Sequence, residues 1–506
     1  MLTLRIYTLA LMFGLPIVPL TRAQDPAPQN QNPPPAQERT NPAQPLPPDK
    51  SADDQGKPSP DDQPISPVVA GTVVDAPLGG AAMPIIGLVR SRSYVVPALS
   101  YYGLLDSNAN NAAGNYQFAS INTLMASLAV QKLGRVSQFN LGYLIGRSFS
   151  NAGGEFNSTT HDLVVSDLWS RGRWDGFIYE KLLYSSVAGL LGGAVPFDNI
   201  GLDNVGGLNA TGPIILHNSF VPGQGIFTGF GPRLNNTTVG QVTNHMSRRT
   251  YFTLVGNYDS LHFFNSDSAL IDSSAAGFQA GLGYQRTRED TIAVVYRYTD
   301  FWFGSVPISV RDNILQLAYQ RQLGQRVVFQ IGAGPEFTYI HDATLVGGTV
   351  GTPLPSTTRI SWSLGSNLEY RLRRVSLRAG YDHFLTAGYG VFLGAITDRA
   401  NFTYSRQVSR VWNVSATASY AHNVNLVPLF TPTQNIPANA SYDSTYAGFE
   451  AQRRVGRDSE VFFGYVGRYQ TASFVACPTG ICKGSNFVGH QVNFGFSWRL
   501  KPFPVD

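Results

Sequence analysis

The sequence predicts an all-β fold, namely an antiparallel up-and-down β-barrel of about 18 strands that crosses a membrane. Three observations support this prediction. Apolar and polar residues alternate over long stretches, only 14% of the residues are charged, and short arginine-rich turns recur along the chain. No internal segment forms the run of roughly 18 apolar residues that a membrane helix needs, so strands are the elements expected to cross the bilayer.

Three segments precede the predicted barrel. Residues 1–23 are predicted to be a secretory signal peptide, because Arg5 precedes an apolar stretch and Thr21-Arg22-Ala23 forms a small-x-small cleavage site. Residues 24–67 are rich in Pro, Gln and Asp and predict a disordered tether. This tether is either a passive spacer or a segment that contacts cell-wall material. Residues 68–92 form a short apolar lead-in, and residues 93–506 form the barrel.

The clearest hairpin spans residues 311–340. From Val327 to Tyr339 the odd positions are apolar, whereas the even positions from Gln330 to Thr338 are polar or glycine. Because side chains alternate faces along a strand, one face of this strand is apolar. The two arms meet at the short turn Gln322-Leu323-Gly324-Gln325. Each arm is long enough to span a membrane as a tilted strand of about 9–11 residues.

Seven further strand pairs joined by short turns are predicted in the same way. They cover residues 119–132 and 136–150, 162–170 and 174–185, 238–247 and 250–264, 274–286 and 291–303, 358–372 and 375–385, 391–408 and 411–424, and 442–454 and 459–474. A last strand covers 486–500. Since a bacterial barrel normally has an even number of strands, residues 93–105 are predicted as the first strand. This makes 18 strands, with 16 as the alternative; Pro97 in the first strand removes one ladder donor.

The two ends of these strands differ in composition. The eight short turns and their flanks carry 18 of the 37 basic residues, whereas the opposite connections are longer and nearly free of Lys and Arg. Aromatic residues sit beside the short turns, as in an interfacial girdle. They are Trp169, Trp174, Tyr251, Tyr284, Tyr319, Tyr370, Tyr404, Trp412 and Trp498.

With this architecture the chain resembles the Gram-negative outer-membrane β-barrel proteins of porin-like size. The resemblance implies a multi-pass barrel in the bacterial outer membrane, with the N- and C-termini and the short turns in the periplasm. The final strand, residues 489–500, resembles the signal that the barrel-insertion machinery reads, although residues 501–506 follow its aromatic Trp498. Outer-membrane lipids and that machinery are therefore expected partners, and a homo-oligomer is compatible with the sequence.

Ionisable residues at the positions between the apolar alternates are expected to line the pore. They are Arg297, Glu336, Glu369, Arg378, Asp382, Arg399, Glu450 and Arg468. Four bases and four acids predict a hydrated pore with weak net selectivity. The alternative is that they pair into salt bridges that brace a closed interior.

Two long connections carry further predictions. The resemblance to general porins implies that the third external loop, residues 187–237 with Asp198 and Asp203, folds inward as a constriction; a surface-exposed loop is the alternative. Cys477 and Cys482 lie close together in the last external loop, which predicts a disulfide in an exported protein.

Other classes of function find little support in the sequence. No hydrolase, metalloprotease or nucleotide-binding motif occurs in a supporting context, so neither an enzyme nor a cofactor nor a metal site is expected. The pairs Asp382-His383 and His341-Asp342 are interpreted as ordinary strand-end residues. The net charge of +4 does not indicate nucleic-acid binding. The expected function is passive diffusion of small hydrophilic solutes; the alternative is a structural or surface-interaction barrel without an open pore, and an outer-membrane hydrolase is a weaker third hypothesis.

Overall fold

The structure is a computed structural model that describes residues 93–109, 117–152, 157–185, 232–264, 270–304, 306–324, 326–341, 356–388, 390–427, 429–430, 435–436, 439–473 and 486–504. The segments predicted as signal peptide (1–23), tether (24–67) and lead-in (68–92) lie outside these residues. So do Asp198 and Asp203 of the predicted constriction loop, and Cys477 and Cys482 of the predicted disulfide. These hypotheses stay predictions.

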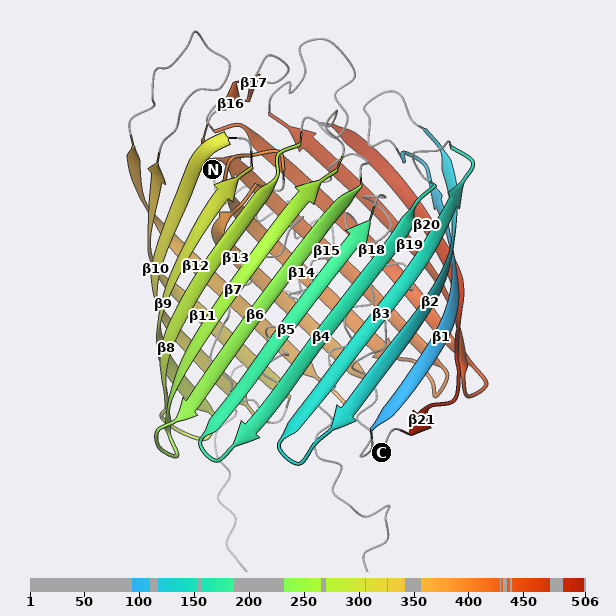
Figure 1. Cartoon of the computed structure of the whole chain (residues 1–506), viewed down its shortest axis with the longest axis horizontal. Coiled ribbons are helices and arrows are strands. Elements are labelled where there is room, and N and C mark those ends of the chain that lie inside the picture. The colour runs from blue at the N-terminus through green and yellow to red at the C-terminus, as the bar shows by residue number, and fades with distance from the viewer. Residues whose placement is uncertain are drawn as a thin grey trace, which may run out of the picture. The chain divides into compact units, whose positions relative to one another are not determined.

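The described residues form a closed antiparallel β-barrel (Figure 1). Each long strand pairs with the next along the chain, and β20 pairs with β1 to close the wall. The wall strands are β1 (Tyr94–Asp106), β2 (Ala119–Leu133), β3 (Ser137–Ser150), β4 (Thr159–Arg171), β5 (Trp174–Ser185), β6 (Arg233–His245), β7 (Thr250–Phe263), β8 (Ser273–Gln285), β9 (Asp290–Phe303), β10 (Val306–Leu323), β11 (Val327–His341), β12 (Thr357–Arg371), β13 (Val375–Thr386), β14 (Ala395–Gln407), β15 (Trp412–Asn425), β18 (Ser441–Val455), β19 (Ser459–Ala472) and β20 (Phe487–Arg499). These 18 strands, among the described residues, confirm the predicted number over the alternative of 16.

Three short strands complete the described elements. β16 (Leu429–Phe430) pairs with β17 (Asn435–Ile436), separately from the wall. β21 (Phe503–Pro504) follows the last wall strand and pairs with Tyr94 and Val95 of β1. The residues beyond Trp498 therefore extend the closure between the first and last strands. No helix among the described residues is long and apolar enough to span a membrane.

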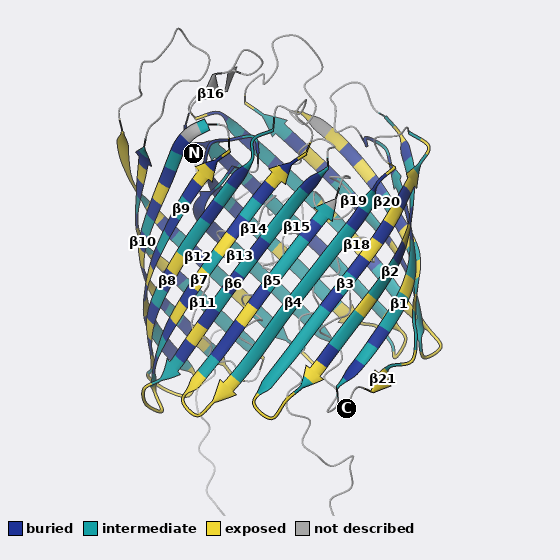
Figure 2. Ribbon diagram, in the orientation of Figure 1, coloured by how far each residue is buried: buried dark blue, intermediate teal, exposed yellow. Residues whose placement is uncertain are grey.

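The barrel wall buries alternate residues on its inner side and exposes large apolar residues on its outer side (Figure 2). In β9, Val295 and Arg297 are 3% and 2% exposed, whereas Val294 and Tyr296 between them are 50% and 40% exposed. This period of two is the pattern from which the strands were predicted. The end that carries the tight turns, which lies lowest in Figure 1, is called the turn end here, and the opposite end is called the loop end.

Pro97 has no backbone N–H to donate, and β1 tolerates it because Pro97 lies just beyond the end of the β1–β20 ladder. The Pro97 carbonyl accepts a hydrogen bond from the backbone N of Leu500, at 3.0 Å, and the β1–β20 ladder begins at the next residue, Ala98. In an antiparallel strand the N and the carbonyl of one residue point to the same neighbouring strand. The Pro97 nitrogen therefore faces the β20 side, and the β1–β2 ladder loses no hydrogen bond. That ladder runs through Pro97, which lies opposite Leu128.

One predicted strand begins later than the sequence pattern indicates. The strand predicted over 391–408 begins at Ala395, because the preceding residues form a turn in which Gly388, Gly390 and Gly394 have φ angles of 78°, 80° and 81°. Residues in this left-handed region cannot continue a strand. The prediction was wrong at these four positions, and the turn that replaces the strand end shapes the loop-end mouth.

Candidate functional site: the barrel interior and its two mouths

The structure places all eight predicted pore-lining residues on the inner side of the wall. They come from β9 (Arg297), β11 (Glu336), β12 (Glu369), β13 (Arg378 and Asp382), β14 (Arg399), β18 (Glu450) and β19 (Arg468). Five of them, Arg297, Glu336, Arg399, Glu450 and Arg468, are less than 5% exposed. Their position follows from the alternation in the sequence, but their burial does not.

Two pairs form among the predicted residues because cross-strand register sets their members opposite each other. Asp382 faces Arg399 across β13 and β14, and the Arg399 Nη2 donates to the Asp382 Oδ2 at 2.7 Å. Glu369 faces Arg378 across β12 and β13, with 3.5 Å between the Arg378 Nη2 and the Glu369 Oε1. Opposite charges in such positions stabilise a sheet and offset part of the cost of burying each charge.

A third charged group lies on β9, β10 and β11. Arg297, Ile314 and Glu336 occupy one row across these strands, and Asp312 lies two residues from Ile314 on the same face. Arg297 interacts electrostatically with Asp312, Glu336 and Asp382, and its Nε donates to the Gln279 Oε1 at 3.4 Å. Asp312, which is 3% exposed, was not among the predicted lining residues; its place on the same inward face as Gln316 is the signal that identifies it.

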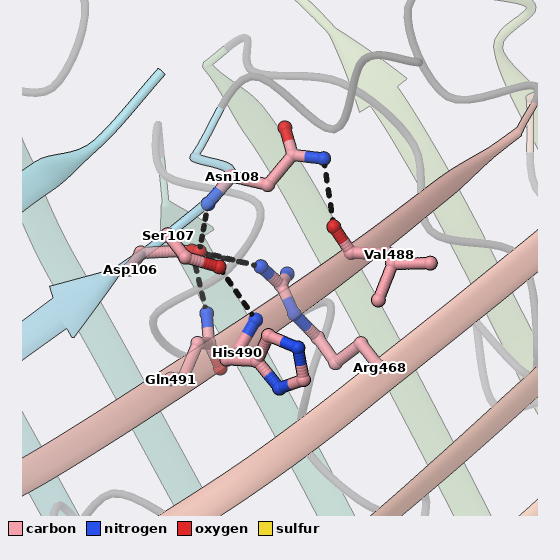
Figure 3. A network of polar contacts seen from close by, with 7 residues as sticks. All are labelled: Asp106, Ser107, Asn108, Arg468, Val488, His490 and Gln491. Atoms are coloured by element: carbon pink, nitrogen blue, oxygen red, sulfur yellow. Dashed lines mark hydrogen bonds and ion pairs between the residues drawn. The ribbon is translucent and has the colours of Figure 1, made fainter. Parts of the chain in front are cut away.

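Arg468 belongs to a polar network at the loop end of the barrel closure (Figure 3). Its Nη2 donates to both carboxylate oxygens of Asp106, at 2.9 and 2.8 Å. The same carboxylate accepts from the Gln491 Nε2 at 2.8 Å and from the backbone N of Asn108 at 3.0 Å. Because Asp106 lies on β1, Arg468 on β19 and Gln491 on β20, this network joins the first strand to the last two.

Glu450 lies inside the wall of β18 and is 1% exposed. Its Oε1 accepts a hydrogen bond from the Nε2 of Gln452, two residues along the same face. Most charged residues of the interior are thus engaged with neighbouring polar groups, whereas both carboxylate oxygens of Glu336 are buried without a hydrogen bond of standard geometry. Such contacts brace the wall. This observation supports the alternative prediction, in which salt bridges brace a closed interior.

The loop-end mouth carries a buried apolar cluster, here called the loop-end cluster. Phe392 and Leu393, in the turn between β13 and β14, are fully buried. They belong to a cluster with residues whose side chains lie on the inner side of the neighbouring strands, including Phe301, Phe303, Ile308, Val310, Ile340 and Tyr442. The turn therefore packs against the inner face of the barrel.

Two further contacts show how far this turn reaches. The backbone N of Ile271, just before β8, donates to the Gly390 carbonyl at 2.8 Å. A Cβ built on Gly390 would lie 2.6 Å from the ring of Phe263 at the end of β7. The β12–β13 ladder ends at Leu364 and His383, and beyond this point β13 pairs only with β14, up to Thr386 and Ala395. The turn thus extends from β13 and β14 to β7 and β8 and narrows the loop-end mouth.

The turn-end mouth carries many charged side chains. A pocket of about 450 Å³ lies there between the β12–β13 turn, the β14–β15 turn and the inner faces of β14, β18 and β19. Its lining includes six arginines, Arg371, Arg373, Arg374, Arg378, Arg410 and Arg454, and two glutamates, Glu369 and Glu460. Only Glu369 and Arg378 of this set were predicted as lining residues. The others lie in or beside turns that are far apart in the sequence and adjacent in the barrel.

The two histidine–aspartate neighbours in the sequence do not form a catalytic arrangement among the described residues. Asp382 faces inward to Arg399, whereas His383 faces outward, with its Nδ1 2.7 Å from the Asp398 Oδ1. The His383 ring stacks on Trp362, with 4.0 Å between the ring centroids. Asp342, the neighbour of His341, lies outside the described residues.

Comparisons with solved structures find proteins that are similar to this chain at low identity. The Pseudomonas aeruginosa proteins OccK2 (OpdF) and OpdQ align with 11% and 9% identity, each at a TM-score of 0.40. The alignments cover 81% and 82% of this chain and 98% and 100% of those chains. The Escherichia coli ferric-catecholate import receptor Fiu aligns with 11% identity and a TM-score of 0.38, over 81% of this chain and 82% of the receptor. No family model and no curated protein matches the sequence. At these values the likeness concerns the fold alone.

Proposed function

We propose that this protein is a bacterial outer-membrane channel through which small hydrophilic solutes diffuse passively. One observation carries the proposal: a closed wall of 18 strands exposes apolar side chains outward and holds ionisable side chains inward. Barrels of about 16–18 strands leave an aqueous passage, whereas about eight strands are filled by their own side chains. The tight turns at one end correspond to the periplasmic side of such barrels.

The proposed mechanism combines a size limit with the electrostatics of the wall. The loop-end cluster narrows the external mouth from the side of β13 and β14, which limits the size of a solute that enters. Below it, part-exposed ionisable side chains of the inner wall such as Glu369 and Arg378 supply the electrostatic contribution. The proposal needs no energy source, because the solute moves down its own gradient.

A barrel with a structural role and no open passage is the second candidate. The observation that favours it is the burial of Arg297, Glu450 and Arg468, whose hydrogen bonds brace the interior. The two candidates differ in one measurable property, namely permeability.

Swelling of liposomes that contain the purified protein separates the two candidates. A channel lets uncharged sugars enter, and the swelling rate falls as the sugar grows from a pentose to a trisaccharide. Liposomes without protein and liposomes with heat-denatured protein are the controls. If even the smallest sugar causes no swelling above these controls, the structural role replaces the channel.

A further inference from the structure

The pocket at the turn-end mouth, here called the arginine pocket, has an excess of positive charge. Six arginines and two glutamates line it, which gives a net charge of +4 (six minus two). The eight lining residues predicted from the sequence carry equal numbers of bases and acids. The excess therefore comes from the turn arginines, which that prediction did not include.

The carboxylates of the arginine pocket are already engaged. The Glu369 Oε1 lies 2.5 Å from the Arg371 Nε and 3.5 Å from the Arg378 Nη2. The Glu460 Oε2 accepts from the Arg499 Nη2 at 3.1 Å. Arg373, Arg374, Arg410 and Arg454 have no carboxylate within ion-pair distance among the described residues, and all four are exposed. These four guanidinium groups are accessible to an anion from solution.

Backbone hydrogen bonds hold these arginines in place. The Arg374 carbonyl accepts from the backbone N of Gln407, at 2.8 Å, which ties the β12–β13 turn to the end of β14. The backbone N of Arg454 donates to the Val411 carbonyl at 2.8 Å, which ties β18 to the β14–β15 turn. The Ser409 hydroxyl accepts from the backbone N of Val411 and of Trp412 at 3.2 and 3.1 Å. The arginines therefore project from ordered turns.

Apart from the apolar Leu372, Val375, Leu377, Val411 and Trp412, the remaining lining residues suit a small polar ligand. Ser376, Thr403, Ser405, Gln407, Asn413 and Gln452 supply hydroxyl and amide groups around the arginines. A guanidinium binds carboxylate or phosphate through two parallel hydrogen bonds. The volume of about 450 Å³ is in the range of small-molecule pockets. These features together describe a site for an anion with more than one acidic group.

We infer that the arginine pocket is a low-affinity binding site for small polyanionic solutes, such as tricarboxylates and phosphate esters, at the periplasmic mouth. Weak binding suits a passage, because a solute that binds tightly leaves slowly. The inference rests on the proposed channel function in one respect, because only a conducting channel can show the expected preference for anions over cations. The binding site itself does not depend on whether the channel conducts.

A matched pair of triple variants tests the inference. The pocket variant carries Arg374→Gln, Arg410→Gln and Arg454→Gln. The control variant carries Arg248→Gln, Arg249→Gln and Arg288→Gln, which removes the same charge from exposed turn arginines that do not line the pocket. All of these positions are exposed, and folding is checked by circular dichroism before binding is measured.

Two readouts separate this inference from the proposed function. Calorimetric titration of the detergent-solubilised full-length protein with citrate measures the site directly. The pocket variant is expected to raise the citrate Kd about ten-fold, since exposed charge contacts are individually weak and three are removed, whereas the control leaves it unchanged. In bilayers of uncharged lipid, the zero-current potential in a KCl gradient is expected to indicate anion preference in the wild type and in the control, and to fall in the pocket variant.

Each outcome decides one of the two proposals. Citrate binding that the pocket variant loses, in a protein that forms no channel, supports the site and overturns the channel. Absence of citrate binding to the wild type, or an equal loss in both variants, overturns the inference whether or not the protein conducts.

Discussion

The two mouths of the barrel differ in chemistry although the same strands form them. At the loop end, Phe392 and Leu393 are packed into an apolar cluster inside the wall. At the turn end, exposed arginines surround a pocket of about 450 Å³. The loop-end mouth is narrowed by a turn that folds inward, whereas the turn-end mouth is bordered by short turns.

This difference indicates that the two mouths select solutes by different properties. An apolar constriction discriminates by size and hydration, because it offers a solute no replacement for lost water. A cluster of positive charge discriminates by the sign of the solute's charge and concentrates anions near it. In the proposed channel, a solute therefore meets the size limit first when it enters from outside and the charge preference last.

The largest expected effect comes from removing the loop-end constriction. Replacing residues 387–394 by Asn-Gly, a two-residue hairpin turn, should leave β13 and β14 joined and clear the mouth. Single-channel conductance in planar bilayers should rise about two-fold or more, because the narrowest section dominates the resistance. A one-residue shortening at the turn end, deletion of Gly456, should leave conductance near the wild-type value. Unchanged conductance in the first variant would place the constriction elsewhere.

The next largest effect concerns the polar contacts that close the barrel at each end. Arg468→Met leaves the Asp106 carboxylate buried without this arginine, which should lower the free energy of unfolding by about 3–5 kcal/mol. The matched change at the turn end, Arg499→Met, breaks a part-exposed pair with Glu460 and should cost less than about 1 kcal/mol. Urea unfolding in detergent, followed by intrinsic fluorescence, measures both. Equal losses of unfolding free energy in the two variants would contradict the difference between the two ends of the closure.

Packing of the loop-end cluster gives a further test. Leu393→Ala should lower the free energy of unfolding by about 2–5 kcal/mol, because the side chain is fully buried and its loss leaves a cavity. Ile360→Ala, on a side chain that is 71% exposed on β12, serves as the control and should have a much smaller effect in the same unfolding assay. A small effect at Leu393 would mean that the turn packs loosely against the wall.

The smallest expected effect is a decrease in anion preference with rising salt concentration, which only the turn-end mouth should produce. The screening length falls from about 10 Å at 0.1 M salt to about 3 Å at 1 M, so the exposed arginines should act over a shorter range. The anion preference should therefore decrease as the KCl concentration rises at a fixed concentration ratio, whereas the size limit for uncharged sugars should stay the same. A size limit for uncharged sugars that changes with salt would contradict the independence of the two mouths.

The barrel and its inward residues follow from local patterning in the sequence. A period of two sets which side chains point inward, and one slipped residue would turn every apolar side chain to the wrong face, so the pattern specifies the register strongly. Arg297, Glu336 and Arg399 could be assigned to the interior for this reason. The eighteenth strand followed from the need for an even number, even though Pro97 weakens the pattern there.

The two mouths could not be predicted because both depend on contacts between distant residues. Val391-Phe392-Leu393 has the composition of a strand, and only packing against β9, β10 and β11 makes an inward turn more favourable. The arginines of the pocket are separated by up to 83 positions, from Arg371 to Arg454, and meet because the barrel brings their turns together. Composition revealed the basic turns but not which of them share a pocket.

Polymer exclusion in planar bilayers probes an open passage and both of its mouths in one measurement. Uncharged polyethylene glycols of graded size are added to one side of a single oriented channel, and the conductance is recorded. An open channel that is narrower at the loop end should give stable conductance steps and a smaller excluded polymer size from the loop end than from the turn end. Absence of steps would contradict the channel, and equal cut-off sizes from both sides would contradict the difference between the mouths.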